Sequence, residues 1–164
     1  MLNKLEELRK NKESGFTIIE VMIVLAIAGL ILLIVLLAVP ALQRNSRNTQ
    51  IKNDAANIVG AISTFVTDND GAIPTGIDPP DSEGVVKIYK GTSYAVATAK
   101  STAKIQAGTA IEEATGVPTT APDPGKLVYV VKRSCDSTST VNRSIAIYYS
   151  VETSGAPQLK CVNS

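Results

Sequence analysis

Glu20 stands at the start of a long apolar segment, and its carboxylate is the first group in the sequence that needs a chemical role. Residues 21–39 carry no charged or polar side chain, and residues 40–42 extend the apolar run. An unpaired carboxylate in hydrocarbon costs on the order of 2.5–3.5 kcal/mol. Glu20 must therefore lie in water at the headgroup level or neutralise a cationic partner.

The apolar run predicts a helix that spans a membrane. At about 1.5 Å rise per residue, the segment covers roughly the 30 Å thickness of a bilayer core. It has no polar stripe at helical spacing, which a surface helix of a soluble domain would show. The helix would place Glu20 at one edge of the bilayer.

The residues ahead of this helix form a short charged leader with four basic and three acidic side chains: Lys4, Arg9, Lys10, Lys12, Glu6, Glu7 and Glu13. Gly15 and Phe16 follow directly, and Glu20 lies four residues after Phe16. A basic leader, then Gly and Phe-Thr-x-x-Glu entering an apolar helix, resembles the class III signal of type IV pilins and pseudopilins.

This resemblance implies a processing route and an assembly role. A prepilin peptidase would cut between Gly15 and Phe16 on the cytoplasmic side, and the new amino terminus of Phe16 would be N-methylated. Glu20 would pair with the Phe16 amine of a neighbouring subunit and so fix the register of assembly. Residues four apart share a helix face, and an ammonium group can neutralise a buried carboxylate.

Two other interpretations of the segment are open. A conventional secretory signal has a shorter apolar region followed by a small-residue cleavage site. The side chains of residues 39–41 are small enough for such a cleavage site. However, the apolar run is too long for a secretory signal, and Glu20 has no place in one. A plain single-span anchor needs neither the Gly15-Phe16 junction nor Glu20.

Composition argues against catalysis and against nucleic-acid binding. The 164 residues carry a net charge of +1, and removal of the leader leaves twelve basic and twelve acidic residues. Nucleic-acid binding usually shows a basic excess, so this partner is possible but unsupported. The chain lacks histidine, the commonest general base and metal ligand. No nucleophile elbow, phosphate-binding loop or metalloprotease motif is present, so we expect no enzyme, metal or cofactor.

The helix should continue beyond the membrane as an amphipathic segment. Between residues 44 and 68, polar residues, Asp54 among them, fall on the other faces of the helix. Apolar residues recur every three or four positions on one face: Ile51, Ala55, Ile58, Ile62 and Phe65. Residues 69–71 predict the helix end, with Gly71 in the left-handed conformation. Gly29 and Pro40 predict a break or kink, because proline removes a backbone hydrogen bond. The resemblance implies that such a stretch can lose helicity within a filament.

The remaining chain predicts a small β domain. We expect strands at residues 85–89, 93–97, 126–133, 144–151 and 158–162, and a short helix or irregular excursion at 99–115. Residues 117–125 are rich in proline and predict a break.

The β region also carries the cysteines and several basic residues. Cys135 and Cys161 predict one disulfide in an extracytoplasmic compartment. Basic residues near them would form a patch for an anionic surface or would be ordinary solvated side chains: Lys126, Lys132, Arg133, Arg143 and Lys160.

The predicted architecture is α+β, a long N-terminal helix packed on an antiparallel sheet of four or five strands. Its segments are a cytoplasmic leader at 1–15, a transmembrane or filament-core half-helix at 16–42, an amphipathic half at 43–70, and a disulfide-bonded β domain at 71–164.

The resemblance implies the structural subunit of a type IV pilus for adhesion, motility or DNA uptake, held in the inner membrane and then exported as an extracellular filament. Its partners would be like subunits, the membrane, the prepilin peptidase and methyltransferase, and the pilus assembly machinery. The alternatives are a pseudopilin of a type II secretion or competence system and a membrane-anchored domain that never polymerises.

Overall fold

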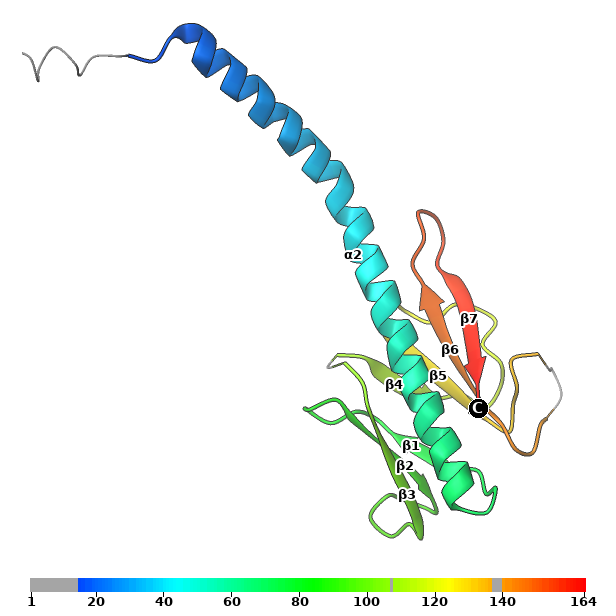
Figure 1. Ribbon diagram of the computed structural model, residues 1–164. Coiled ribbons are helices and arrows are strands. Elements are labelled where there is room, and N and C mark those ends of the chain that lie inside the picture. The colour runs from blue at the N-terminus through cyan, green and yellow to red at the C-terminus, as the bar shows by residue number, and fades with distance from the viewer. Residues whose placement is uncertain (1–14, 107, 137–139) are drawn as a thin grey trace, which may run out of the picture. The chain divides into compact units, whose positions relative to one another are not determined.

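The computed structural model describes residues 15–106, 108–136 and 140–164, so all of the predicted leader except Gly15 lies outside the described part. The chain divides into two compact units, Met1–Leu42 and Gln43–Ser164. One helix, α2 (Ile18–Asp68), and seven strands make up the regular structure of the described residues (Figure 1). The predicted α+β class is confirmed.

In the first unit, the helix exposes its apolar side chains on all sides. Leu36 and Leu37 each leave 74 % of their surface accessible, and Ile34 leaves 56 %. Helix α2 is long and apolar enough to cross a membrane, judged by length and composition. Because large contiguous apolar surfaces mark interaction sites, lipid or other protein must cover this segment.

Helix α2 runs through Gly29 and Pro40 without interruption in the single chain. The kink expected from these two residues stays a prediction. Proline deletes its own hydrogen bond and crowds the preceding turn, but the turns on either side keep theirs, so a helix of this length tolerates it. A loss of helicity within a filament stays a prediction.

In the second unit, the predicted apolar face of α2 is the buried one. Ile58, Ile62 and Phe65 are at most 1 % exposed, and they pack with apolar residues of the strands in one core. The helix end is also confirmed. The Gly71 amide donates to the carbonyl of Val66 at 2.8 Å, which closes the last turn. Both Asp70 and Gly71 take the left-handed conformation there.

Asp54 corrects the predicted polar face. Its side chain is 4 % exposed, and the carboxylate accepts hydrogen bonds from the Gln106 amide at 3.0 Å and the Thr109 hydroxyl at 2.6 Å. A buried carboxylate is tolerated when donors satisfy its oxygens. Asp54 thus ties α2 to the loop that enters the second sheet, a contact that helix periodicity does not reveal.

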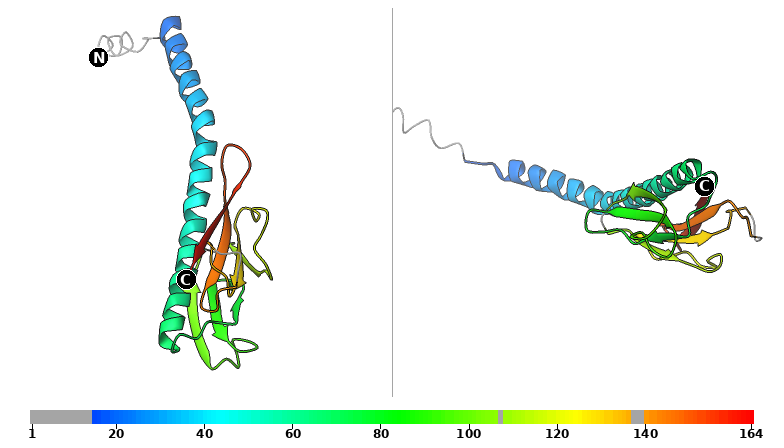
Figure 2. Two further views of the ribbon diagram at one scale, coloured as in Figure 1. Left: turned by 90° about the vertical axis from the view of Figure 1, so that its right-hand side faces the viewer. Right: turned by 90° about the horizontal axis from the view of Figure 1, so that it is seen from below.

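Two small sheets pack on this half of the helix (Figure 2). The first is an antiparallel sheet of three strands in the order β1-β2-β3: β1 (Gly76–Asp78), β2 (Val85–Lys90) and β3 (Ala99–Lys104). The second has the order β4-β5-β6-β7: β4 (Ala110–Glu113), β5 (Lys126–Val131), β6 (Ile145–Val151) and β7 (Gln158–Asn163). Its pairs are antiparallel except β4 with β5, which is parallel.

Several strand predictions need correction. Residues 93–97 form a turn in place of a strand, and residues 99–115 contain β3 and β4 in place of a short helix or irregular excursion. Two sheets replace the expected single sheet. The proline-rich break is the connection from β4 to β5, whose length suits a crossover between parallel strands.

The second sheet is covered on both faces. On the helix side, Tyr129, Ile147 and Tyr149 join the main core. On the outer side, Val130 and Tyr148 form a smaller cluster that the disulfide helps to cover. This two-sided burial explains why β5 and β6 are almost continuously apolar in sequence.

The predicted disulfide is present between Cys135 and Cys161, with 5.7 Å between their Cα atoms. Cys135 follows β5 and Cys161 lies in β7, so the bond crosses the outer face of β6. Cross-linking positions 26 residues apart stabilises the fold by roughly 3–4 kcal/mol in the chain-entropy model.

Ile62→Ala should lower the free energy of unfolding of the second unit by about 2–5 kcal/mol, because it removes a fully buried side chain from the core under both sheets. All five tyrosines follow residue 88, so tyrosine fluorescence of the detergent-solubilised full chain follows this unit in a denaturant titration. Ile34→Ala, at an exposed helix position, is the matched control and should change stability by less than about 0.5 kcal/mol. Equal effects of the two substitutions would contradict the assigned core.

Candidate functional site

The helix start is built from Thr17 and Glu20, which hydrogen-bond to each other in both directions. The Thr17 amide donates to Glu20 Oε2 at 3.0 Å, and the Thr17 hydroxyl donates to the same oxygen at 2.8 Å. The Glu20 amide in turn lies 3.3 Å from Thr17 Oγ1, which accepts its hydrogen bond. This is a capping box, in which two residues satisfy free amides of the first helical turn.

The capping role of Glu20 was not predicted, although the sequence carries a signal for it. The pattern Thr-x-x-Glu directly before an apolar run is typical of a capping box. Both side-chain bonds fall on Oε2, and within the described residues Oε1 accepts none. The carboxylate can therefore cap its own helix and still accept a bond from another chain.

Gly15 and Phe16 precede the helix and are open to solvent. Phe16 leaves 88 % of its surface accessible. A Cβ atom added at Gly15 would meet no described atom within 4 Å, so packing of the chain itself does not require glycine there. The peptide bond between the two residues is thus accessible. If glycine is required at position 15, the requirement comes from an enzyme that cleaves this bond and not from the fold.

The basic residues near the disulfide do not all belong to one surface patch. Lys126 forms an ion pair with Glu112 at 2.6 Å, within the second sheet. The guanidinium of Arg143 lies against Gly71, next to the negative end of the α2 dipole. These two side chains have local structural roles, which is the ordinary interpretation of the cluster.

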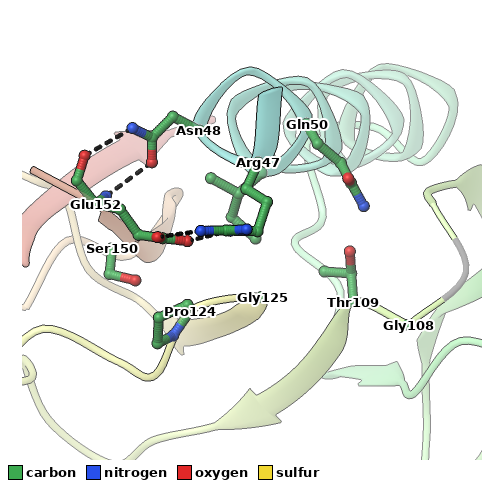
Figure 3. Close-up of a pocket in the computed structure, with 10 residues that line it drawn as sticks. Arg47, Asn48, Gln50, Gly108, Thr109, Pro124, Gly125, Ser150 and Glu152 are labelled. Carbon is green, nitrogen blue, oxygen red and sulfur yellow. Dashed lines mark hydrogen bonds and ion pairs between the residues drawn. The ribbon is translucent and has the colours of Figure 1, made fainter. Parts of the chain in front are cut away.

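A second candidate site lies between α2 and the ends of strands β4 and β6 (Figure 3). Arg47 donates two hydrogen bonds to the Glu152 carboxylate, at 2.6 and 2.7 Å. Asn48 bonds the Glu152 backbone twice, donating to its carbonyl and accepting from its amide. Four hydrogen bonds thus join one turn of the helix to the end of β6.

This junction borders a cavity of about 180 Å³. Ser150 lines it, and the buried hydroxyl of this residue has no hydrogen-bond partner among the described residues. The described residues contain no group of three or more His, Cys, Asp and Glu side chains placed to hold a metal ion.

The comparisons with known proteins agree with the N-terminal site. Residues 10–36 match the family model of the prokaryotic N-terminal methylation motif. No curated protein and no solved structure matches the chain. The chain therefore carries the class III signal of type IV pilins, and its long N-terminal helix fits that signal.

The motif also indicates the class of protein. It supports a type IV pilin-like or pseudopilin protein, and it implies processing by a prepilin peptidase and assembly into filaments. The apolar helix suits membrane anchoring before assembly.

The Arg47–Glu152 pair predicts a pH dependence of stability. Hydrogen bonds from Arg47 hold the pKa of Glu152 below its ordinary value. A depressed pKa in the folded chain stabilises the fold above the unfolded pKa of about 4.3, and this stabilisation is lost as the pH falls through the folded value. Wild type should therefore be more stable than Glu152→Gln at pH 7, with the difference shrinking below about pH 4.5.

Thermal unfolding of both chains between pH 7 and pH 3 tests this dependence. Glu83→Gln is the control, because the Glu83 side chain makes no hydrogen bond or ion pair within the described residues. A wild-type minus Glu152→Gln difference that stays constant with pH would rule out the ion pair as its source.

Proposed function

We propose that this chain is the structural subunit of a type IV pilus, cleaved between Gly15 and Phe16, N-methylated at Phe16 and polymerised through the first half of α2. One observation carries the proposal. The methylation motif leads directly into a helical segment whose apolar side chains are exposed on all sides. The exposed apolar side chains would contact lipid before assembly and neighbouring helices after it.

During assembly the apolar half of α2 would move from lipid to contact with neighbouring helices. Lipid tails are as apolar as leucine, so helices in a filament core gain little from apolar burial alone. Register must then come from polar contacts. Glu20 supplies one: its Oε1 is available, and the Phe16 amine of the next subunit would bind it and neutralise the charge.

The proposed role is structural, without catalysis. The partners are like subunits, the prepilin peptidase and methyltransferase, and the pilus assembly machinery, and the filament would serve adhesion, motility or DNA uptake at the cell surface. Before export the chain is a single-pass inner-membrane protein whose second unit faces away from the cytoplasm.

Mass analysis of material sheared from the cell surface tests processing and export together. We expect an intact chain that starts at Phe16, carries one methyl group and is two hydrogens lighter than the dithiol form. Gly15→Leu should abolish cleavage and leave the full-length chain in the membrane. Gly60→Ala, a glycine change outside the motif at an uncrowded helix position, should be cleaved normally. A processed chain confined to the membrane fraction would favour a pseudopilin, and a start at Met1 or Leu42 would refute the pilus model.

The two roles of Glu20 can be separated by a matched pair of variants. Glu20→Gln keeps an oxygen for the capping box but removes the charge. Thr17→Ala removes the cap, at a cost of about 0.5–2 kcal/mol, and keeps the charge. If the carboxylate pairs with an ammonium, Glu20→Gln should be cleaved but form no filaments, whereas Thr17→Ala should still assemble.

Filament yield in the sheared fraction, with cleavage checked in whole cells, is the measurement. Normal filaments from Glu20→Gln would refute the ionic role. A defect confined to Thr17→Ala would assign Glu20 to capping alone.

A further inference from the structure

The loop between β2 and β3 exposes apolar residues that the sequence suggested would be buried. Residues 93–97 have the composition of a strand, yet Val96 leaves 71 % of its surface accessible and Ala95 is also exposed. In the described part of the second unit, Val96 and Val117 are the exposed large apolar side chains. We name residues 93–97 the tip.

The tip is held in place and surrounded by positive charge. Tyr94 packs edge-on against Tyr89, with 6.4 Å between ring centroids. The ammonium groups of Lys87 and Lys100 lie 5.9 and 5.2 Å from the Tyr94 ring centroid, and Lys100 also donates to the Ala95 carbonyl. A fixed apolar loop ringed by lysines is suited to a partner with an apolar hollow and acidic edges.

The connection from β4 to β5 forms such a hollow on the same chain. The hollow has a volume of about 360 Å³, and its lining combines small apolar residues and prolines with acidic residues: Glu112, Glu113, Ala114, Pro118, Thr120, Ala121, Pro122, Asp123, Lys126 and Val128. We name it the acidic hollow. Its single lysine is paired with Glu112, so Glu113 and Asp123 leave the hollow negative.

Within the described residues, no hydrogen bond or ion pair joins the tip to the acidic hollow. At the base of the tip, Gly91 and Thr75 exchange two hydrogen bonds of 2.9 Å just after the end of α2, and Figure 1 shows this loop beside that helix end. Asp123 lines the hollow, and the next residue, Pro124, lines the cavity beside Arg47.

Because the tip does not bind the acidic hollow in the folded chain, their complementarity is free to be used between copies. We infer that the tip of one subunit docks in the acidic hollow of a neighbouring copy. Val96 and Ala95 would lie against the prolines and alanines of the hollow, and Lys90 or Lys100 would face Asp123. A contact between two different surfaces builds an open helical array when its rotation does not close a ring.

This inference rests on the proposed pilus function and adds to it a contact between the exported units. Apolar contact supplies burial, and the opposite charges select the register, because like-charge alignments cost several kcal/mol. The contact is independent of Glu20, so it can be tested in filaments whose helical core is unchanged.

Cysteine cross-linking tests the contact directly. The native cysteines form a disulfide with each other, so introduced cysteines have no native thiol to compete with. Sheared filaments of the full chain with Val96→Cys and Ala121→Cys should give a ladder of dimers and higher oligomers on a non-reducing gel after mild oxidation. Val96→Cys with Ser154→Cys, placed outside the hollow, should stay monomeric.

A charge exchange tests the selection of register. Lys90→Glu or Asp123→Lys alone should lower filament yield by about tenfold. The double variant Lys90→Glu with Asp123→Lys should restore yield to near the wild-type level, which a general folding defect would not allow.

The outcomes separate the two proposals. Filaments that form from the double cysteine variant but remain monomeric after oxidation would overturn the docking contact and leave the pilus function intact. A cross-link to a different protein in place of the ladder would overturn it as well. Failure of the wild-type chain to form any filament would overturn the pilus function and this contact with it.

Discussion

The structure depends on one constraint, the exposure of the apolar half of α2. Each large side chain left in water costs roughly 25 cal/mol for every Å² of apolar surface. Among the described residues, the buried positions of α2 begin at Ile51, so the apolar segment before them is not covered. The segment is therefore stable only beside lipid or other apolar helices, and the methylation motif overlaps its start.

The apolar face of the second half of the same helix is buried within the chain, because the two sheets pack on it. Polar contacts then fix where those sheets attach. Asp54 accepts two hydrogen bonds from the loop before β4, and Arg47 with Asn48 bonds the end of β6. Both contacts join residues roughly fifty or more positions apart, so they form only after the chain has folded.

Glu20 shows how one side chain can serve two states. Within a single chain it caps the helix through Oε2, so the carboxylate is never without a hydrogen-bond donor as it nears the membrane. Its second oxygen leaves room for the partner that the proposed assembly requires. A capped carboxylate explains how the residue can persist at the edge of an apolar segment before any neighbour arrives.

The sequence by itself determined the long helix, its two halves, its end at Gly71, the disulfide and the N-terminal motif. These features depend on local periodicity, length and residue spacing. The tertiary structure decided the parallel pairing of β4 with β5, the burial of Asp54 and the exposure of residues 93–97. The physical reason is that strand neighbours and buried polar pairs depend on contacts between distant segments, and short apolar runs look the same whether they face the core or solvent.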